Sequence, residues 1–324
     1  MKHPRRAFLQ MVVGAAALPF FSRMAWSLDY PTRPVRFIVG FPAGTGPDVT
    51  GRIIAEPLSE RFGQQFVVDN RPGAGGSVAV EAVATAQPDG YTLLLTLSSS
   101  VVNSLLYPNQ NFTLPRDIAP VAFVGGTPYV MVVTPSLPVK SLPEFIAYAK
   151  ANPGKIYMAS QGIGTTPHAC GELLKMLTGI DVMHVPYRAS LIPDLLAGQV
   201  HFYFSPMPQP LQYVKDGRLR ALGVSTAKRL DVLPDVPSIG EFVPGYEAIG
   251  WSGVGAPKGT PAAVIDVLNA KIGDIVNNDP QMAARLRDAG ILPRVMTPAE
   301  FGGFIADETE KWAKVIKFSN IKPE

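Results

Sequence analysis

The sequence predicts an α/β protein made of two lobes, each with a parallel-sheet core. Strand and helix patterns alternate in the order strand, helix, strand, helix, strand over residues 35–97. Strands joined through helices form parallel sheets with right-handed crossovers. A second alternating series covers residues 141–225. The chain has 324 residues, 47% of them hydrophobic, which is enough for two domains of ordinary size.

The first unit starts with an apolar run of strand length, VRFIVGF, at residues 35–41. A helix ending near Arg61 follows, and Pro57 is expected to bend it. Three further elements complete the unit. These later elements are a strand at 66–69, a helix at 77–86 and a strand at 91–97.

The second unit begins after Pro128. The last third of the chain, from Pro261 on, is predicted to be helical. The predicted strands are at 156–159, 182–185, 201–205 and 220–225, and the predicted helices at 141–151, 167–177, 262–277, 281–289 and 299–318. Prolines open the last three helices. We assign residues 28–125 plus 251–324 to lobe 1 and 126–250 to lobe 2. The chain crosses twice between them, near Gly125 and at 246–255, which predicts a cleft with hinges.

Residues 1–27 have the pattern of a signal peptide, with a basic start, an apolar stretch at 11–21 and small residues around Trp26. Arg5-Arg6 is twin-arginine-like, but the neighbouring Pro4 leaves the export route open. We expect cleavage after Ser27 and a periplasmic location.

The chain without the predicted signal peptide is near neutral. Four of the 29 basic residues lie in that peptide, which leaves 25 against 26 acids. This balance gives no electrostatic case for nucleic acid as a partner. Cys170 is the only cysteine, so no intramolecular disulfide is possible.

Two glycine-containing loops lie where ligands bind in open α/β sheets, at the carboxyl ends of strands. They cover residues 41–48 and 160–167, and each leads from a strand into a helix near a proline. Glycine permits close approach of the backbone, and the free N–H groups of a helix start attract anions. The pair therefore predicts two opposed sites for a carboxylate. The alternative is two tight turns that only cap helices, and Asp48 could satisfy the first helix dipole from within.

The sequence contains only weak signatures of an enzyme. Val254 stands where the nucleophile elbow of a hydrolase needs glycine, the histidines lie on separate elements, and no metal-ligand spacing occurs. Neither loop has a nucleotide-binding fingerprint. We expect no catalytic residue, no metal and no cofactor. Two other readings stay open: an exported serine hydrolase using Ser98, Ser99 or Ser252, and a sensory receptor that presents its ligand to a membrane kinase.

Three motifs resemble the Bug family, the periplasmic solute-binding receptors of tripartite tricarboxylate transporters. They are NRPGAGG at 70–76, PDGYTLL at 88–94, and the block from AYAKANPGK at 147–155 to HVPY at 184–187. The resemblance implies a Venus-flytrap fold of the type II periplasmic binding protein kind. It also implies a monomer that is not an enzyme, takes a small organic carboxylate between its lobes and delivers it to integral membrane permease subunits.

The resemblance further implies ligand contacts from both lobes. The implied residues are Phe41, Ala43, Gly44, Thr45, Asp48, Ser98, Ser99, Gln161, Gly162, Gly164, Thr165, Thr166, His168, Tyr187, Arg188 and Ser205. The loop at 189–193 is shorter than is usual in the family, and Ser205 stands where many members have aspartate. These departures indicate a ligand preference of its own. Phe202, Tyr203 and Met207 near this loop suggest room for an aromatic or long-chain acid.

Overall fold

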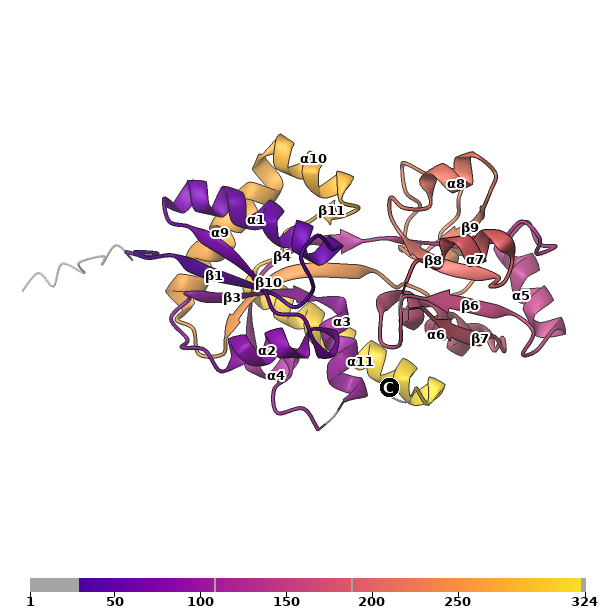
Figure 1. Cartoon of the computed structure of the whole chain (residues 1–324), viewed down its shortest axis with the longest axis horizontal. Helices are drawn as coiled ribbons and strands as arrows, with labels where there is room; N and C mark the ends of the chain where they lie inside the picture. Colours follow the sequence, from indigo (N-terminus) through magenta and orange to yellow (C-terminus); the bar gives the residue numbers. More distant parts are fainter. Residues whose placement is uncertain (1–28, 108, 188, 322–324) are drawn as a thin grey trace, which may run out of the picture.

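The computed structural model describes residues 29–107, 109–187 and 189–321, and the predicted signal peptide and Arg188 lie outside this part. Two lobes lie side by side, each built on its own sheet (Figure 1). We call the part with the six-stranded sheet lobe 1 and the part with the five-stranded sheet lobe 2.

The lobe 1 sheet combines parallel and antiparallel strands. Its order is β11 (Leu292–Pro293), β4 (Ile118–Thr127), β10 (Gly250–Pro257), β3 (Thr92–Leu97), β1 (Val35–Val39) and β2 (Phe66–Asn70). β1 pairs in parallel with β2 and β3, whereas β10 pairs antiparallel with β3 and β4. The predicted parallel core is therefore the β2-β1-β3 half of a mixed sheet.

Helices cover both faces of this sheet because its side chains alternate between them. Phe37 packs in one cluster with α1 (Gly46–Phe62), α9 (Ala262–Asn278) and α10 (Pro280–Asp288). Its neighbour Ile38 packs on the other side with α2 (Ser77–Ala84), α3 (Ser98–Leu106) and α11 (Pro298–Ser319). The short helices η1 (Ala74–Gly76) and α4 (Leu114–Asp117) complete the lobe.

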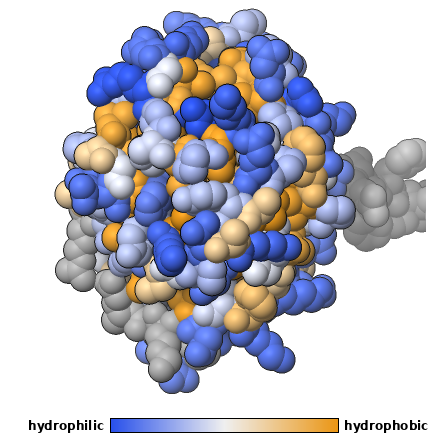
Figure 2. Space-filling model, turned by 90° about the vertical axis from the view of Figure 1, so that its right-hand side faces the viewer, coloured by the Kyte–Doolittle hydropathy of each residue, from blue (hydrophilic) through white to orange (hydrophobic). Residues whose placement is uncertain are grey.

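Lobe 2 repeats the arrangement on a smaller scale. Its strand order is β7 (Met183–Pro186), β6 (Tyr157–Ser160), β8 (Phe202–Pro206), β5 (Tyr129–Val133) and β9 (Arg220–Val224), with β7, β6 and β8 parallel and β5 antiparallel to β8 and β9. Its helices are α5 (Leu142–Ala151), α6 (Thr166–Thr178), α7 (Ile192–Ala197), α8 (Leu211–Lys215) and η2 (Ile239–Glu241). The end of this lobe shows polar residues with apolar ones between them (Figure 2).

Three segments link the lobes. β4 runs into β5 through Pro128, and the return passes through residues 246–249 into β10. The C-terminal helix α11 packs against both α3 of lobe 1 and α6 of lobe 2. Tyr246, in the return segment, donates its hydroxyl to the Cys170 carbonyl on α6 at 3.1 Å. One apolar cluster consequently continues from lobe 1 into lobe 2.

The predicted strands and helices of both units are confirmed, with ends shifted by one or two residues in most cases. The prediction overlooked β4, β5, β10 and α3, and also the shorter elements β11, α4, α7, α8, η1 and η2. β10 contains three glycines, which are poor strand formers. Close packing explains all three, since an added Cβ would lie 2.8 Å from the Tyr129 hydroxyl at Gly250, 2.5 Å from the Phe301 ring at Gly253 and 2.4 Å from Ile118 at Gly255. The exact lobe boundaries stay a prediction.

Candidate functional site

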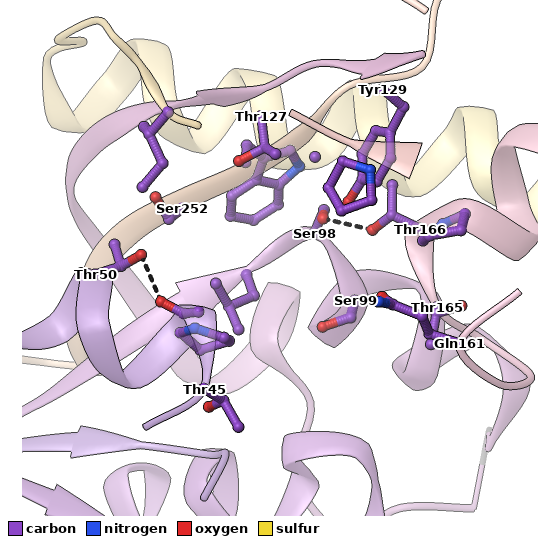
Figure 3. Close-up of a pocket in the computed structure, with 18 of the residues that line it drawn as sticks. Thr45, Thr50, Ser98, Ser99, Thr127, Tyr129, Gln161, Thr165, Thr166 and Ser252 are labelled. Atoms are coloured by element: carbon purple, nitrogen blue, oxygen red, sulfur yellow. Dashed lines mark hydrogen bonds between the residues drawn. The ribbon is translucent and has the colours of Figure 1, made fainter. Parts of the chain in front are cut away.

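A cavity of about 510 Å³ lies between the lobes (Figure 3). Lobe 1 contributes Phe41, Thr45, Gly46, Pro47, Thr50, Leu97, Ser98, Ser99, Trp251, Ser252, Ala289 and Ile291 to its lining. Lobe 2 contributes Gln161, Thr165, Thr166, Pro167, Pro206 and Met207, and the crossings add Thr127, Tyr129 and Gly250. A molecule that fills the cavity therefore contacts both lobes.

Three helices begin at this cavity: α1 and α3 of lobe 1 and α6 of lobe 2. Their N-cap residues are Thr45, Leu97 and Thr165, and none of these three side chains accepts a capping hydrogen bond from its helix among the described residues. The first N–H groups of a helix have no partner inside the helix and carry the positive end of its dipole. The cavity is therefore suited to an anion.

The ends of α3 and α6 meet directly. The Ser98 and Thr166 hydroxyl oxygens lie 3.0 Å apart in a buried hydrogen bond between the first residues of the two helices (Figure 3). One helix belongs to each lobe. The positive ends of two dipoles thus point to one place at the boundary between the lobes.

None of the lining residues that the structure describes is charged. Hydroxyl groups alternate with the apolar side chains of Phe41, Leu97, Trp251, Met207 and Ile291. Such walls are typical of small-molecule sites, in which a few polar groups fix the orientation of a mostly apolar body. Helix ends and hydroxyls take the place of a basic side chain here.

Asp48 stabilises the first loop through hydrogen bonds to its carboxylate. Its carboxylate accepts hydrogen bonds from the Gly44 N–H at 2.9 Å, the Asn70 amide at 2.9 Å and the Arg52 guanidinium. These bonds, that of Arg52 above all, lower the pKa of Asp48 to about 2. Asp48 stays charged near neutral pH and keeps the loop in place.

A group of hydroxyl and imidazole side chains braces the second loop. Ser160 accepts from the Gly162 N–H at 3.1 Å, and its hydroxyl lies 2.6 Å from His184 Nε2. His168 stacks on His184 at 3.8 Å and accepts from the Gly164 N–H at 3.3 Å. Burial, and then the charge of Lys175, lowers the pKa of His168 to about 4. Neutral His168 can therefore accept the loop N–H.

The structure brings seven of the predicted site residues to the cavity wall: Phe41, Thr45, Ser98, Ser99, Gln161, Thr165 and Thr166. Eight others lie outside the lining: Ala43, Gly44, Asp48, Gly162, Gly164, His168, Tyr187 and Ser205. Arg188 lies outside the described residues. Tyr187 donates to Asp194 at 2.8 Å, and the fully buried Ser205 donates to Gln209 at 3.3 Å. Ligand contact by any of these residues stays a prediction.

Sequence reasoning missed the wall formed by Thr127, Tyr129 and Gly250 of the crossings and by the adjacent Trp251. The available signal was the position of the crossings themselves, since both hinges of a cleft border its interior. Of the apolar residues suggested near the shortened loop, Met207 lines the cavity. Phe202 and Tyr203 are instead fully buried on β8.

The serines considered as nucleophiles have no histidine beside them among the described contacts. The Ser98 hydroxyl pairs with Thr166. The Ser252 oxygen is buried and has no hydrogen-bond partner in the described part of the chain. An activated serine needs a base within hydrogen-bond distance.

No helix among the described residues combines the length and apolar character needed to cross a membrane. Residues 50–321 match the family described as tripartite tricarboxylate transporter family receptor. The chain is 38% identical over 298 residues to BugT of Bordetella pertussis, covering 90% of this chain and 91% of that protein.

Two solved structures have the same fold. Rpa4515 of R. palustris with adipate is 36% identical with a TM-score of 0.78, covering 91% of this chain and all of that one. The periplasmic binding protein BugD is 31% identical with a TM-score of 0.73, again over 91% and 100% of the two chains. The predicted Venus-flytrap fold and the predicted family are thereby confirmed. This chain belongs to the tripartite tricarboxylate transporter receptor family, the Bug family of solute-binding proteins.

Proposed function

We propose that this chain binds a small organic carboxylate between its lobes, without catalysis, and delivers it to a tripartite tricarboxylate-type transporter in the membrane. The observation that carries the proposal is the uncharged cavity onto which α1, α3 and α6 direct their N-termini. A carboxylate there receives backbone N–H groups and hydroxyls from both lobes.

The same geometry supports capture by closure. A ligand that contacts both lobes favours the conformation in which the lobes are together, because only that conformation offers all of its contacts. The bound adipate of the relative Rpa4515 supports the chemical class. We further propose that residues 1–27 direct export and are removed after Ser27, and that the mature chain acts in the periplasm as a monomer.

The test is a thermal-shift screen of mature protein against organic acids, each paired with its neutral amide. A ligand at 100 times its Kd stabilises the fold by about 2.7 kcal/mol, so the binding acid raises the Tm and its amide does not. A flat response across a broad panel of acids would contradict the proposal.

A pair of aspartate variants locates the site. Ser99→Asp places a carboxylate in the first turn of α3 at the cavity, where it competes with the ligand while it favours the helix. We expect this variant to fold and to lose the response to the acid. Ser104→Asp lies on the same helix outside the lining and should keep the response. If the acid changes the Tm of the two variants equally, the ligand does not bind at the start of α3.

A further inference from the structure

Gly164, in the second loop of lobe 2, packs directly on α3 of lobe 1. A Cβ atom at this position would lie 2.8 Å from Asn103 Oδ1 and 2.9 Å from Leu106 Cδ1. Real Cβ atoms essentially never approach neighbours below 3.0 Å. Only a residue without a side chain permits this approach of the two lobes.

Asn103 cannot easily make room. It is 7% exposed, and its amide donates to the Gly75 carbonyl at 2.7 Å. Gly75 lies in the NRPGAGG turn, and a Cβ there would lie 2.3 Å from the Asn103 amide nitrogen. The turn therefore fixes Asn103, and Asn103 in turn forms the surface that receives Gly164.

A second glycine makes a similar contact between the lobes. Gly290 of lobe 1, between α10 and β11, lies against the Met207–Pro208 backbone of lobe 2. A Cβ on Gly290 would lie 1.8 Å from the Met207 carbonyl oxygen and 2.6 Å from the Met207 carbonyl carbon. Backbone atoms cannot turn away as a side chain can. Ala289, Ile291 and Met207 beside this contact line the cavity.

We propose that Gly164 and Gly290 are positioning residues that set the closed geometry of the cleft. Their bare backbones let the lobes approach until Ser98 and Thr166 meet. The inference rests on the proposed function, since it concerns the closure that captures the ligand. An alanine at either position adds its methyl group between the lobes and not within one, so each lobe stays folded while the closed state becomes less populated.

Disulfide trapping tests the proposal without a ligand. Ser98→Cys with Thr166→Cys, in a Cys170→Ala background, places two thiols where the hydroxyls lie 3.0 Å apart. With oxidised glutathione added as the oxidant, we expect this pair to form a disulfide. The rate of disulfide formation should fall roughly tenfold with Gly164→Ala or Gly290→Ala, since the energetic cost of overpacking corresponds to about that factor. An unchanged rate with Gly290→Ala, or a pair that does not oxidise at all, would overturn the proposal.

Two further glycines control for backbone strain. Gly164 and Gly290 have φ values of +78° and +79°, a conformation that strains any alanine. Gly179 at +69° and Gly245 at +83° share it, but an added Cβ meets no described atom within 4 Å at either. Gly179→Ala and Gly245→Ala should leave trapping unchanged. If they slow it equally, strain and not the contact between the lobes explains the result.

A double variant separates lobe contact from a local effect on the loop. Asn103→Ala removes the group that Gly164→Ala would strike, and the free end of Leu106 can shift. We expect Gly164→Ala with Asn103→Ala to regain most of the trapping rate, and no recovery would count against the inference. If no carboxylate binds in the thermal screen, the proposed function fails, while trapping still decides the role of the glycines.

Discussion

The hydroxyl of Ser98, the first residue of α3, lies 3.0 Å from the hydroxyl of Thr166, the first residue of α6. The hydrogen bond between these hydroxyls joins the two lobes at the cavity, although the residues are 68 positions apart in the chain. Because the two residues belong to different lobes, the bond requires the lobes to be together. In the proposed closure, this contact brings the N-termini of the two helices together.

This bond predicts a measurable coupling between the two residues. Ser98→Ala and Thr166→Val each remove one hydroxyl, and the double variant removes both. A buried hydrogen bond contributes about 1 kcal/mol, so the two effects on the free energy of unfolding should fall short of additive by roughly that amount. Urea unfolding of the four proteins measures the coupling.

Ser104→Ala serves as the control for this cycle, because the Ser104 hydroxyl bonds within α3 to the Val101 carbonyl. Its effect should add to that of Thr166→Val. Additive effects of Ser98→Ala and Thr166→Val would show that the lobes do not hold this contact in solution.

Asp48 predicts a loss of stability in acid. Its folded pKa of about 2 lies below the ordinary value of 3.8, so the unfolded chain binds a proton first as the pH falls. The stabilisation by Asp48 is complete above about pH 4 and is lost as the pH falls toward 2. The difference in unfolding free energy between the parent and Asp48→Asn should therefore be constant near neutral pH and shrink over this window.

Glu310→Gln provides the comparison, because Glu310 pairs with Lys314 while both side chains are largely exposed. Exposed ion pairs contribute little, so this change should hardly affect stability at any pH. A difference for Asp48→Asn that stays constant down to pH 2 would contradict the role of the Asp48 charge.

The two ligand loops could be predicted because their signals are local. In each loop glycine precedes a proline at a helix start, and the structure places Pro47 and Pro167 in the first turns of α1 and α6. The apolar run that forms β1, buried at all positions except Arg36, is likewise a property of neighbouring residues. Such features need no knowledge of distant segments.

The wall around Trp251 could not be predicted in this way. β10 is buried along its whole length between β3 and β4, so no alternation of polar and apolar residues marks it as a strand. Gly250 and Gly253 are required there because Tyr129 and Phe301, from remote parts of the chain, leave no room for a Cβ atom. The close approach of Gly290 to Met207 depends in the same way on tertiary structure.

Trp251 predicts a fluorescence signal for ligand binding. Its ring lines the cavity, and its indole N–H donates to Glu308 at 3.3 Å. Trp312 donates to the same carboxylate at 2.9 Å but lies outside the lining. An acid that raises the Tm should therefore change the emission of Trp251 as it displaces water from the ring. Titration of mature Trp312→Phe should retain this change, and Trp251→Phe should lose it while its Tm still responds to the acid. If Trp251→Phe keeps the full emission change, the acid binds away from this wall.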